Sequence, residues 1–222
     1  MNRFPLCINL EDKSFLVVGS GRIARRKLSA ISEFTSNITV ISNEEADGLA
    51  YEGLKIVKKS FDASDLEGFD FVITATGSRA QDETIVAACK SRGIPVNAAD
   101  DREECDFFLP GIIKRGDLVV SVSTSGKSPA CSKYLREQIE GIIPANIEKV
   151  LDILGELRMS LPSKVDSQEE RSQIYNYVMH VLLSMDNLDE ASVEEIIEEH
   201  YYEKIGCNNV LGIWSFGILK IY

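Results

Sequence analysis

Two glycines lie between an apolar run and a helical pattern in the sequence VVGSGRIARRK, residues 17–27. Together with Ala24, Gly19 and Gly21 match the spacing G-x-G-x-x-A. In this motif the first glycine allows a tight turn, the second lets the backbone approach a pyrophosphate, and the small third residue packs the helix on the strand. The start of the helix also offers N–H groups to an anion. The motif predicts a dinucleotide-binding turn; the alternative is a strand-to-helix turn that binds no ligand.

Further polar side chains follow the next strand pattern, residues 38–42. Asn43 and Glu44 lie about 20 residues after the glycines, where a polar or acidic side chain commonly binds a ribose hydroxyl. No arginine stands there to meet a 2′-phosphate, which favours NAD over NADP. The alternative is that Asn43 and Glu44 only cap a following helix. Thr76, in TATGSR at the end of a later strand pattern, is expected to line the path of the cofactor.

A strand pattern at residues 94–99 delivers Asn97 and Asp100 to the same carboxyl edge, where ligands of open α/β sheets bind. Asn97 is a candidate for contact with the cofactor. The Asp100 carboxylate could accept a proton, as a general base does. The alternative is a turn or cap aspartate, and Asp101 beside it is easily confused with the base.

A loop rich in hydroxyl groups, STSGKSP, precedes another helical pattern. Ser128 suits the N-cap of that helix, and Pro129 suits its first position. The loop is therefore a candidate second anion site. Its members are Ser123, Thr124, Ser125, Gly126, Lys127 and Ser128. The alternative for Lys127 and the basic residues nearby is a solvated surface charge.

Five apolar runs and two helical patterns must position these residues. The runs cover residues 14–19, 38–42, 54–59, 69–76 and 94–99, and the helical patterns cover 22–33 and 82–91. Their alternation predicts βαβ crossovers and a doubly wound, Rossmann-like parallel sheet. A strand–turn–strand pattern with its turn at residues 114–117 follows, and amphipathic helices are predicted beyond Pro144. The predicted fold class is α/β, with a small α+β dimerisation segment and a C-terminal helical region.

Composition excludes several classes of protein. The chain has 222 residues, 44% of them hydrophobic, and a formal net charge of −11, as expected for a globular protein with one good core and a smaller second unit. It has no basic stripe for duplex nucleic acid and no apolar run of about 20 residues for a membrane span. We therefore expect no nucleic-acid partner, no membrane and, without a secretory signal, a cytoplasmic location. Five cysteines without a C-x-x-C pair predict neither disulfides nor a metal site, and most are expected to be buried.

These motifs together resemble the precorrin-2 dehydrogenase module at the N-terminus of siroheme synthases, some of which are also sirohydrochlorin ferrochelatases. The resemblance rests on the glycine turn followed by Arg26 and Lys27, on VNAADD, CDFFLP and RGDLVVSVSTSGKSP, and on the helix LREQIE. It covers residues 4–144. The chain departs from the family pattern at Ser20, where many members have glycine, and before Asp100, where two alanines replace two valines. The sequence after residue 205 matches nothing in the family.

The resemblance implies that the protein oxidises precorrin-2 to sirohydrochlorin with NAD. It places NAD contacts at Arg22, Ile23, Asn43 and Glu44, and the key aspartate at Asp100. The hydroxyl-rich loop is then expected to bind the acetate and propionate carboxylates of the macrocycle. Bifunctional members of the family also insert ferrous iron as a substrate, for which the same aspartate would be the base. The sequence leaves open whether this chain does so.

The expected organisation has four parts. They are a NAD-binding domain at 1–107, a dimerisation and substrate segment at 108–144, a helical domain at 145–204 and a tail of unknown role at 205–222. The resemblance implies a homodimer that is built on the second part. The alternative function is a sensor that binds NAD without catalysis, and the second anion site argues against it.

Overall fold

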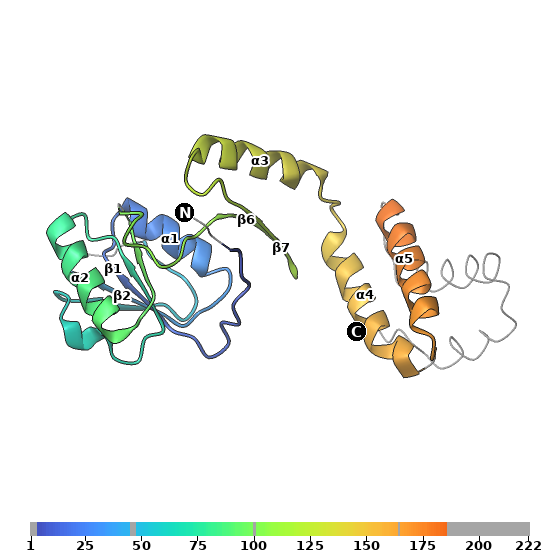
Figure 1. Cartoon of the computed structure of the whole chain (residues 1–222), viewed down its shortest axis with the longest axis horizontal. Coiled ribbons are helices and arrows are strands. Elements are labelled where there is room, and N and C mark those ends of the chain that lie inside the picture. Colours follow the sequence, from blue (N-terminus) through green and yellow to red (C-terminus); the bar gives the residue numbers. More distant parts are fainter. Residues whose placement is uncertain (1–3, 45–47, 100, 164, 186–222) are drawn as a thin grey trace, which may run out of the picture. The chain divides into compact units, whose positions relative to one another are not determined.

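The computed structural model describes residues 4–44, 48–99, 101–163 and 165–185. The chain forms two compact units that divide between Pro110 and Gly111, and Figure 1 shows their elements coloured along the sequence. Asp100 and residues 186–222, for which the sequence predicts a catalytic group, the end of the helical domain and a tail, lie outside the described residues. Within the described ranges, no helix is both long and apolar enough to cross a membrane.

The first unit is built on a five-stranded parallel sheet in the order β3-β2-β1-β4-β5. Apolar and β-branched residues dominate its inner strands, as is typical of parallel sheets that are covered on both faces. Val17 lies at the centre, in register with Val40 on one side and Ile73 on the other, and all three are fully buried. The predicted α/β sheet is confirmed. Its strands are β1 (Phe15–Val18), β2 (Ile38–Ser42), β3 (Lys55–Lys58), β4 (Phe71–Thr74) and β5 (Val96–Ala98).

Two helices cover opposite faces of this sheet. Alternate side chains of β1 point to opposite faces, so that Val17 packs with Leu28 of one helix and Leu16 packs with Ile85 of the other. Leu66 of a short 3-10 helix joins the apolar cluster that contains Leu16 and Ile85. The helices are α1 (Arg22–Ile31), α2 (Arg79–Arg92) and the 3-10 helix η1 (Ala63–Leu66).

The described part of the second unit contains an antiparallel hairpin and three α-helices. The hairpin turns at Gly116 and Asp117, within the predicted turn. Ser132 of α3 donates a 2.9 Å hydrogen bond from Oγ to the Val122 carbonyl of the hairpin. Helices α4 and α5 pack through a continuous apolar core. The elements are β6 (Gly111–Arg115), β7 (Leu118–Val122), α3 (Pro129–Ile142), α4 (Ile147–Ser160), η2 (Leu161–Ser163) and α5 (Gln168–Ser184).

The described cysteines lie in different environments. Cys7 and Cys131 are exposed, Cys105 is partly buried and Cys89 is buried, so the prediction that most cysteines are buried is wrong for this part of the chain. Burial raises the pKa of Cys89 to about 11, which keeps its thiol protonated at neutral pH. Among the residues described, no group of three or more His, Cys, Asp or Glu is arranged to hold a metal ion.

Asp82, in the first turn of α2, holds the end of β4. Its Oδ1 accepts hydrogen bonds from Thr76 N at 3.1 Å and from Thr76 Oγ1 at 2.8 Å, and a further short one from Thr74 Oγ1. Thr74 is fully buried, so its hydroxyl depends on this carboxylate for a partner. The helix dipole also favours an acid at this position. These bonds fix the chain after β4 relative to α2.

Asp82→Ala removes the acceptor and leaves the buried Thr74 hydroxyl without it, so we expect the free energy of unfolding to fall by about 1–3 kcal/mol. The matched control is Glu83→Ala on the next residue of α2, where an exposed carboxylate pairs at the surface with Arg79. Exposed pairs of this kind contribute little to stability. Urea denaturation of both variants measures the difference. Equal stability of the Asp82→Ala variant and the parent would contradict the role of Asp82.

Candidate functional site

A cleft of about 800 Å³ lies at the carboxyl edge of the sheet in the first unit. It is lined by the residues that follow β1, β2, β3 and β4 and by the first turns of α1 and α2. Open α/β sheets bind ligands at this edge, and the volume is in the range of small-molecule and cofactor sites. Most of the predicted cofactor residues line it, namely Gly19, Gly21, Arg22, Ile23, Asn43, Glu44 and Thr76.

The base of the cleft is formed where Gly19, at the end of β1, meets the chain after β4. Gly19 has a φ of +112°, which favours glycine, and a Cβ atom here would lie 2.2 Å from the Ala75 carbonyl oxygen. The Gly19 N–H donates a 2.8 Å hydrogen bond to the Ile41 carbonyl of β2. The first glycine of the motif is therefore required by the packing of three neighbouring strand ends.

Gly21 is the N-cap of α1, with φ −69° and ψ 179°. Among the described residues, no side chain caps this helix, and a Cβ atom at Gly21 would meet nothing within 4 Å. The first N–H groups of a helix have no partner within it, and Arg22 and Ile23 of this turn line the cleft. Ala24 is fully buried against the sheet. This uncapped helix start at the cleft is suited to bind a phosphate anion.

A buried pair of hydroxyls joins the glycine turn to the end of β2. Ser20 Oγ and Ser42 Oγ are 2.9 Å apart, and Ser42 Oγ also accepts a 3.1 Å hydrogen bond from the Glu44 N–H. Arg25 Nε donates to the Ser20 carbonyl at 2.9 Å. Glycine has no hydroxyl to make this contact, so the departure from the family pattern at Ser20 has a structural role. The contacts hold Asn43 and Glu44, both exposed, at the edge of the cleft.

The residues that follow β3 also line the cleft, and the sequence-based prediction lacks them. They are Lys59, Ser60 and Phe61. The Lys59 N–H donates to the Ser42 carbonyl at 3.0 Å, which places this end of β3 beside the expected ribose position at the end of β2. The sequence contains a signal for these residues, because the pattern at residues 54–59 predicts a strand and parallel strands end at the same edge of a sheet.

Asn97 lies in β5 and is not among the described residues that line the cleft. It is 2% exposed; its amide donates a 2.7 Å hydrogen bond to the Phe107 carbonyl and accepts one from Lys27 Nζ. These contacts connect α1 and the chain around Phe107 to the sheet. Contact between Asn97 and the cofactor stays a prediction, and the position of the side chain does not support it.

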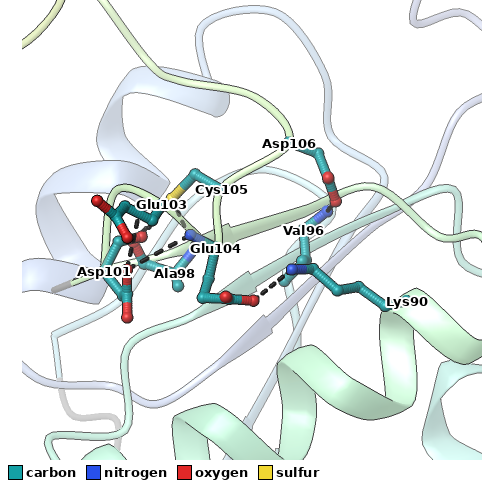
Figure 2. Close-up of polar contacts among 8 residues, drawn as sticks. All are labelled: Lys90, Val96, Ala98, Asp101, Glu103, Glu104, Cys105 and Asp106. Atoms are coloured by element: carbon teal, nitrogen blue, oxygen red, sulfur yellow. Dashed lines mark hydrogen bonds and ion pairs between the residues drawn. The ribbon is translucent and has the colours of Figure 1, made fainter. Parts of the chain in front are cut away.

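Asp101 caps the loop that follows β5 (Figure 2). Its Oδ1 accepts hydrogen bonds from the N–H groups of Glu103 at 3.0 Å and Glu104 at 3.4 Å. Carboxylates that bind the backbone a few residues ahead are typical of turns. Asp101 is thus the turn aspartate of the adjacent pair. The predicted base, Asp100, lies outside the described residues, and the residue before it, Ala99, lines the cleft.

Further links fasten this loop to β5 and α2. The Ala98 N–H donates to Cys105 Sγ at 3.2 Å, and the Val96 N–H donates to Asp106 Oδ2 at 3.0 Å. Figure 2 also shows the ion pair between Glu104 of the loop and Lys90 of α2. The chain is therefore anchored on both sides of the position at which the sequence places the base.

The hydroxyl-rich loop of the second unit is held by its own side chains. Ser128 caps α3 by accepting a 3.1 Å hydrogen bond from the Cys131 N–H, as predicted. Thr124 Oγ1 accepts from the Ser128 N–H at 3.1 Å, and Ser123 Oγ accepts from the N–H two residues ahead at 3.2 Å. These hydroxyls stabilise the loop, whereas Lys127 is exposed and carries the positive charge of the candidate anion site.

Comparison with known proteins identifies two domains. Residues 6–111 match the family of putative NAD(P)-binding domains, and residues 115–142 match the central region of sirohaem biosynthesis proteins. The chain is 32% identical over 179 residues to the siroheme synthase of Psychrobacter sp. (strain PRwf-1) and 35% identical over 179 residues to that of Methylococcus capsulatus. Both alignments cover 79% of this chain, and they cover 37% and 38% of the two relatives. The chain thus spans well under half the length of these relatives.

Among solved structures, one named "SirC, precorrin-2 dehydrogenase" is similar, with a TM-score of 0.67 at 22% identity. The superposition covers 89% of this chain and 98% of that chain, and it shows a shared fold. The two domain matches follow the order of the two units along the chain. This chain therefore belongs to the family of the siroheme synthase N-terminal module, in which a NAD(P)-binding domain precedes a sirohaem biosynthesis central domain.

Proposed function

We propose that this chain oxidises precorrin-2 to sirohydrochlorin with NAD as the hydride acceptor. The observation that carries the proposal is the cleft at the carboxyl edge of the sheet, which contains the glycine turn and the uncapped start of α1. The pairing of a NAD(P)-binding domain with a sirohaem biosynthesis domain supports this reaction, as do the relatives named siroheme synthase.

The residues of the cleft fit a dinucleotide, and one of them favours NAD. The first turn of α1 would bind the pyrophosphate through its N–H groups. Glu44 is exposed at the end of β2, where a carboxylate binds ribose hydroxyls and repels a 2′-phosphate. When bound, the cofactor supplies an acceptor for a hydride.

The oxidation removes a hydride and a proton from the macrocycle, so the chain must orient the substrate and accept the proton. We assign the proton to the Asp100 carboxylate, because Ala99 before it lines the cleft and Asp101 after it is committed to a turn. The acetate and propionate carboxylates of the substrate are assigned to the loop that carries Lys127 and to the start of α3.

The test is incubation of the purified chain with precorrin-2 and NAD, in which sirohydrochlorin is followed by its absorbance. We expect NAD-dependent turnover. Binding of NAD without turnover would overturn the proposal in favour of a sensor. Ferrous or cobaltous ion is then added to the product, and metal insertion that is faster with the chain than without it would assign the ferrochelatase step to this protein as well.

Gly21→Asp tests the position of the pyrophosphate. Aspartate is a good N-cap, and its Cβ atom has room here, so the variant should melt no lower than the parent. Its carboxylate would accept the N–H groups of the first turn and repel the pyrophosphate, and we expect NAD to bind at least about tenfold more weakly. Gly21→Asn is the matched control, because it keeps the size and the cap without the charge. Unchanged NAD affinity of the aspartate variant in isothermal titration would refute the position.

Asp100→Asn keeps the size of the side chain and removes the base. We expect unchanged NAD affinity and Tm and a dehydrogenase rate that falls by about 10²–10⁴-fold. Asp101→Asn is the control; asparagine can cap the same turn, so its rate should stay near that of the parent. Similar rates in the two variants, or full turnover by Asp100→Asn, would contradict the assignment. Any metal insertion should fall together with oxidation if one carboxylate serves both steps.

We also propose that residues 108–144 form a two-fold dimer with a second copy of the chain. No residue of α3 is buried within the chain. Tyr134, Leu135 and Ile142 of this helix are exposed, as is Val119 of β7. Exposed apolar side chains that gather on one segment are typical of an interface, and a second copy with the same segment can cover them.

Light scattering at micromolar concentration should give twice the mass of one chain. Leu135→Glu should reduce this to the mass of one chain, because an interface would bury the new charge without a partner. Asp152→Lys, an exposed substitution on α4, is the control and should leave the dimer intact. A parent protein that is monomeric under these conditions would remove the proposal.

A further inference from the structure

A lysine lies at the ribose end of the cleft. Lys59 follows β3 and lines the cleft, and its N–H donates to the Ser42 carbonyl at 3.0 Å. The residues after Ser42 are those expected to meet the adenosine ribose. Lys59 is thus a neighbour of the position at which the 2′ oxygen would lie. A cation at that position favours NADP, because it can bind the 2′-phosphate.

An acid of η1 holds this cation. Lys59 Nζ and Asp65 Oδ1 are 2.5 Å apart. The other oxygen of the same carboxylate, Oδ2, accepts a 2.9 Å hydrogen bond from the Asp62 N–H, which is part of the capping box of η1. The Asp65 side chain is 14% exposed, whereas that of Lys59 is 40% exposed. The acid is therefore the fixed member of the pair, and the longer lysine side chain is the one able to move.

We infer that Asp65 determines the preference of the cleft for NAD over NADP by holding Lys59. The pair is electrically neutral, and Glu44 at the end of β2 adds a negative charge that repels a 2′-phosphate. Without the Asp65 charge, Lys59 is released and can bind that phosphate. The inference deepens the proposed function and rests on it, because it takes the cleft as the nucleotide site and NAD as the nucleotide that the site prefers.

The test compares NAD and NADP affinities by isothermal titration. Asp65→Asn keeps an oxygen for the Asp62 N–H and removes the charge. NADP should then bind roughly tenfold more tightly; this figure already allows for the solvent that screens the partly exposed Lys59 charge. The affinity for NAD should change by less than about twofold. Adding Lys59→Met to Asp65→Asn should abolish the gain. Glu67→Gln is the control, because it removes the same charge from an exposed side chain beside η1 and should leave the ratio of affinities unchanged.

Three results would overturn the inference. The first is an unchanged affinity ratio in Asp65→Asn, and the second is a gain that persists when Lys59 is also replaced; both would leave the NAD site itself intact. The third is a parent that binds neither nucleotide, which would overturn the proposed function as well. If Asp65→Asn lowers the Tm, Lys59→Glu takes its place: a wider preference for NAD would support the inference, and an unchanged ratio would contradict it.

Discussion

The close approach of Gly19 to the Ala75 carbonyl is the contact on which the whole cleft depends. Because a Cβ atom would come within 2.2 Å of that oxygen, any other residue would push the ends of β1 and β4 apart. The start of α1 and the chain after β4 would move with them. The Gly19 N–H also binds the Ile41 carbonyl of β2, so the base of the cleft is made of packed backbone from three strands. Backbone packing of this kind leaves the edge of the cleft free for side chains that recognise a ligand.

Polar contacts within the fold position that edge. The Ser20 and Ser42 hydroxyls join the glycine turn to β2, and Asp82 holds the end of β4. In the second unit, the hydroxyls of Thr124 and Ser128 support their own loop in the same way. The hydroxyls of Ser20, Ser42 and Thr74 are buried and have partners within the fold, which is stabilising because a buried polar group without a partner is costly. Recognition is thus assigned to backbone N–H groups and to exposed charged side chains.

The two units contribute different parts of one proposed reaction. The first has a helix start and a glycine turn that suit a dinucleotide, and the second has a capped helix preceded by a loop with an exposed lysine. A substrate with carboxylates on every side arm and a cofactor with a pyrophosphate both need cationic or N–H partners. N–H groups at helix starts and single cationic side chains attract an anion over a short range, so a net charge of −11 does not oppose the proposed binding of such ligands.

The α/β layout, the glycine turn and the Ser128 cap could be predicted from the sequence, because each shows as a hydrophobic period along the chain or as residue types a few positions apart. The predicted strand at residues 38–42 coincides with β2 for this reason. Which distant groups meet could be seen only in the folded chain. The buried Asn97 amide donates a hydrogen bond to the Phe107 carbonyl, and Lys59 lines the cleft and pairs with Asp65. Hydrophobic periodicity specifies the face that a strand buries, but the partner of a polar side chain depends on strand order and loop packing, which no local pattern encodes.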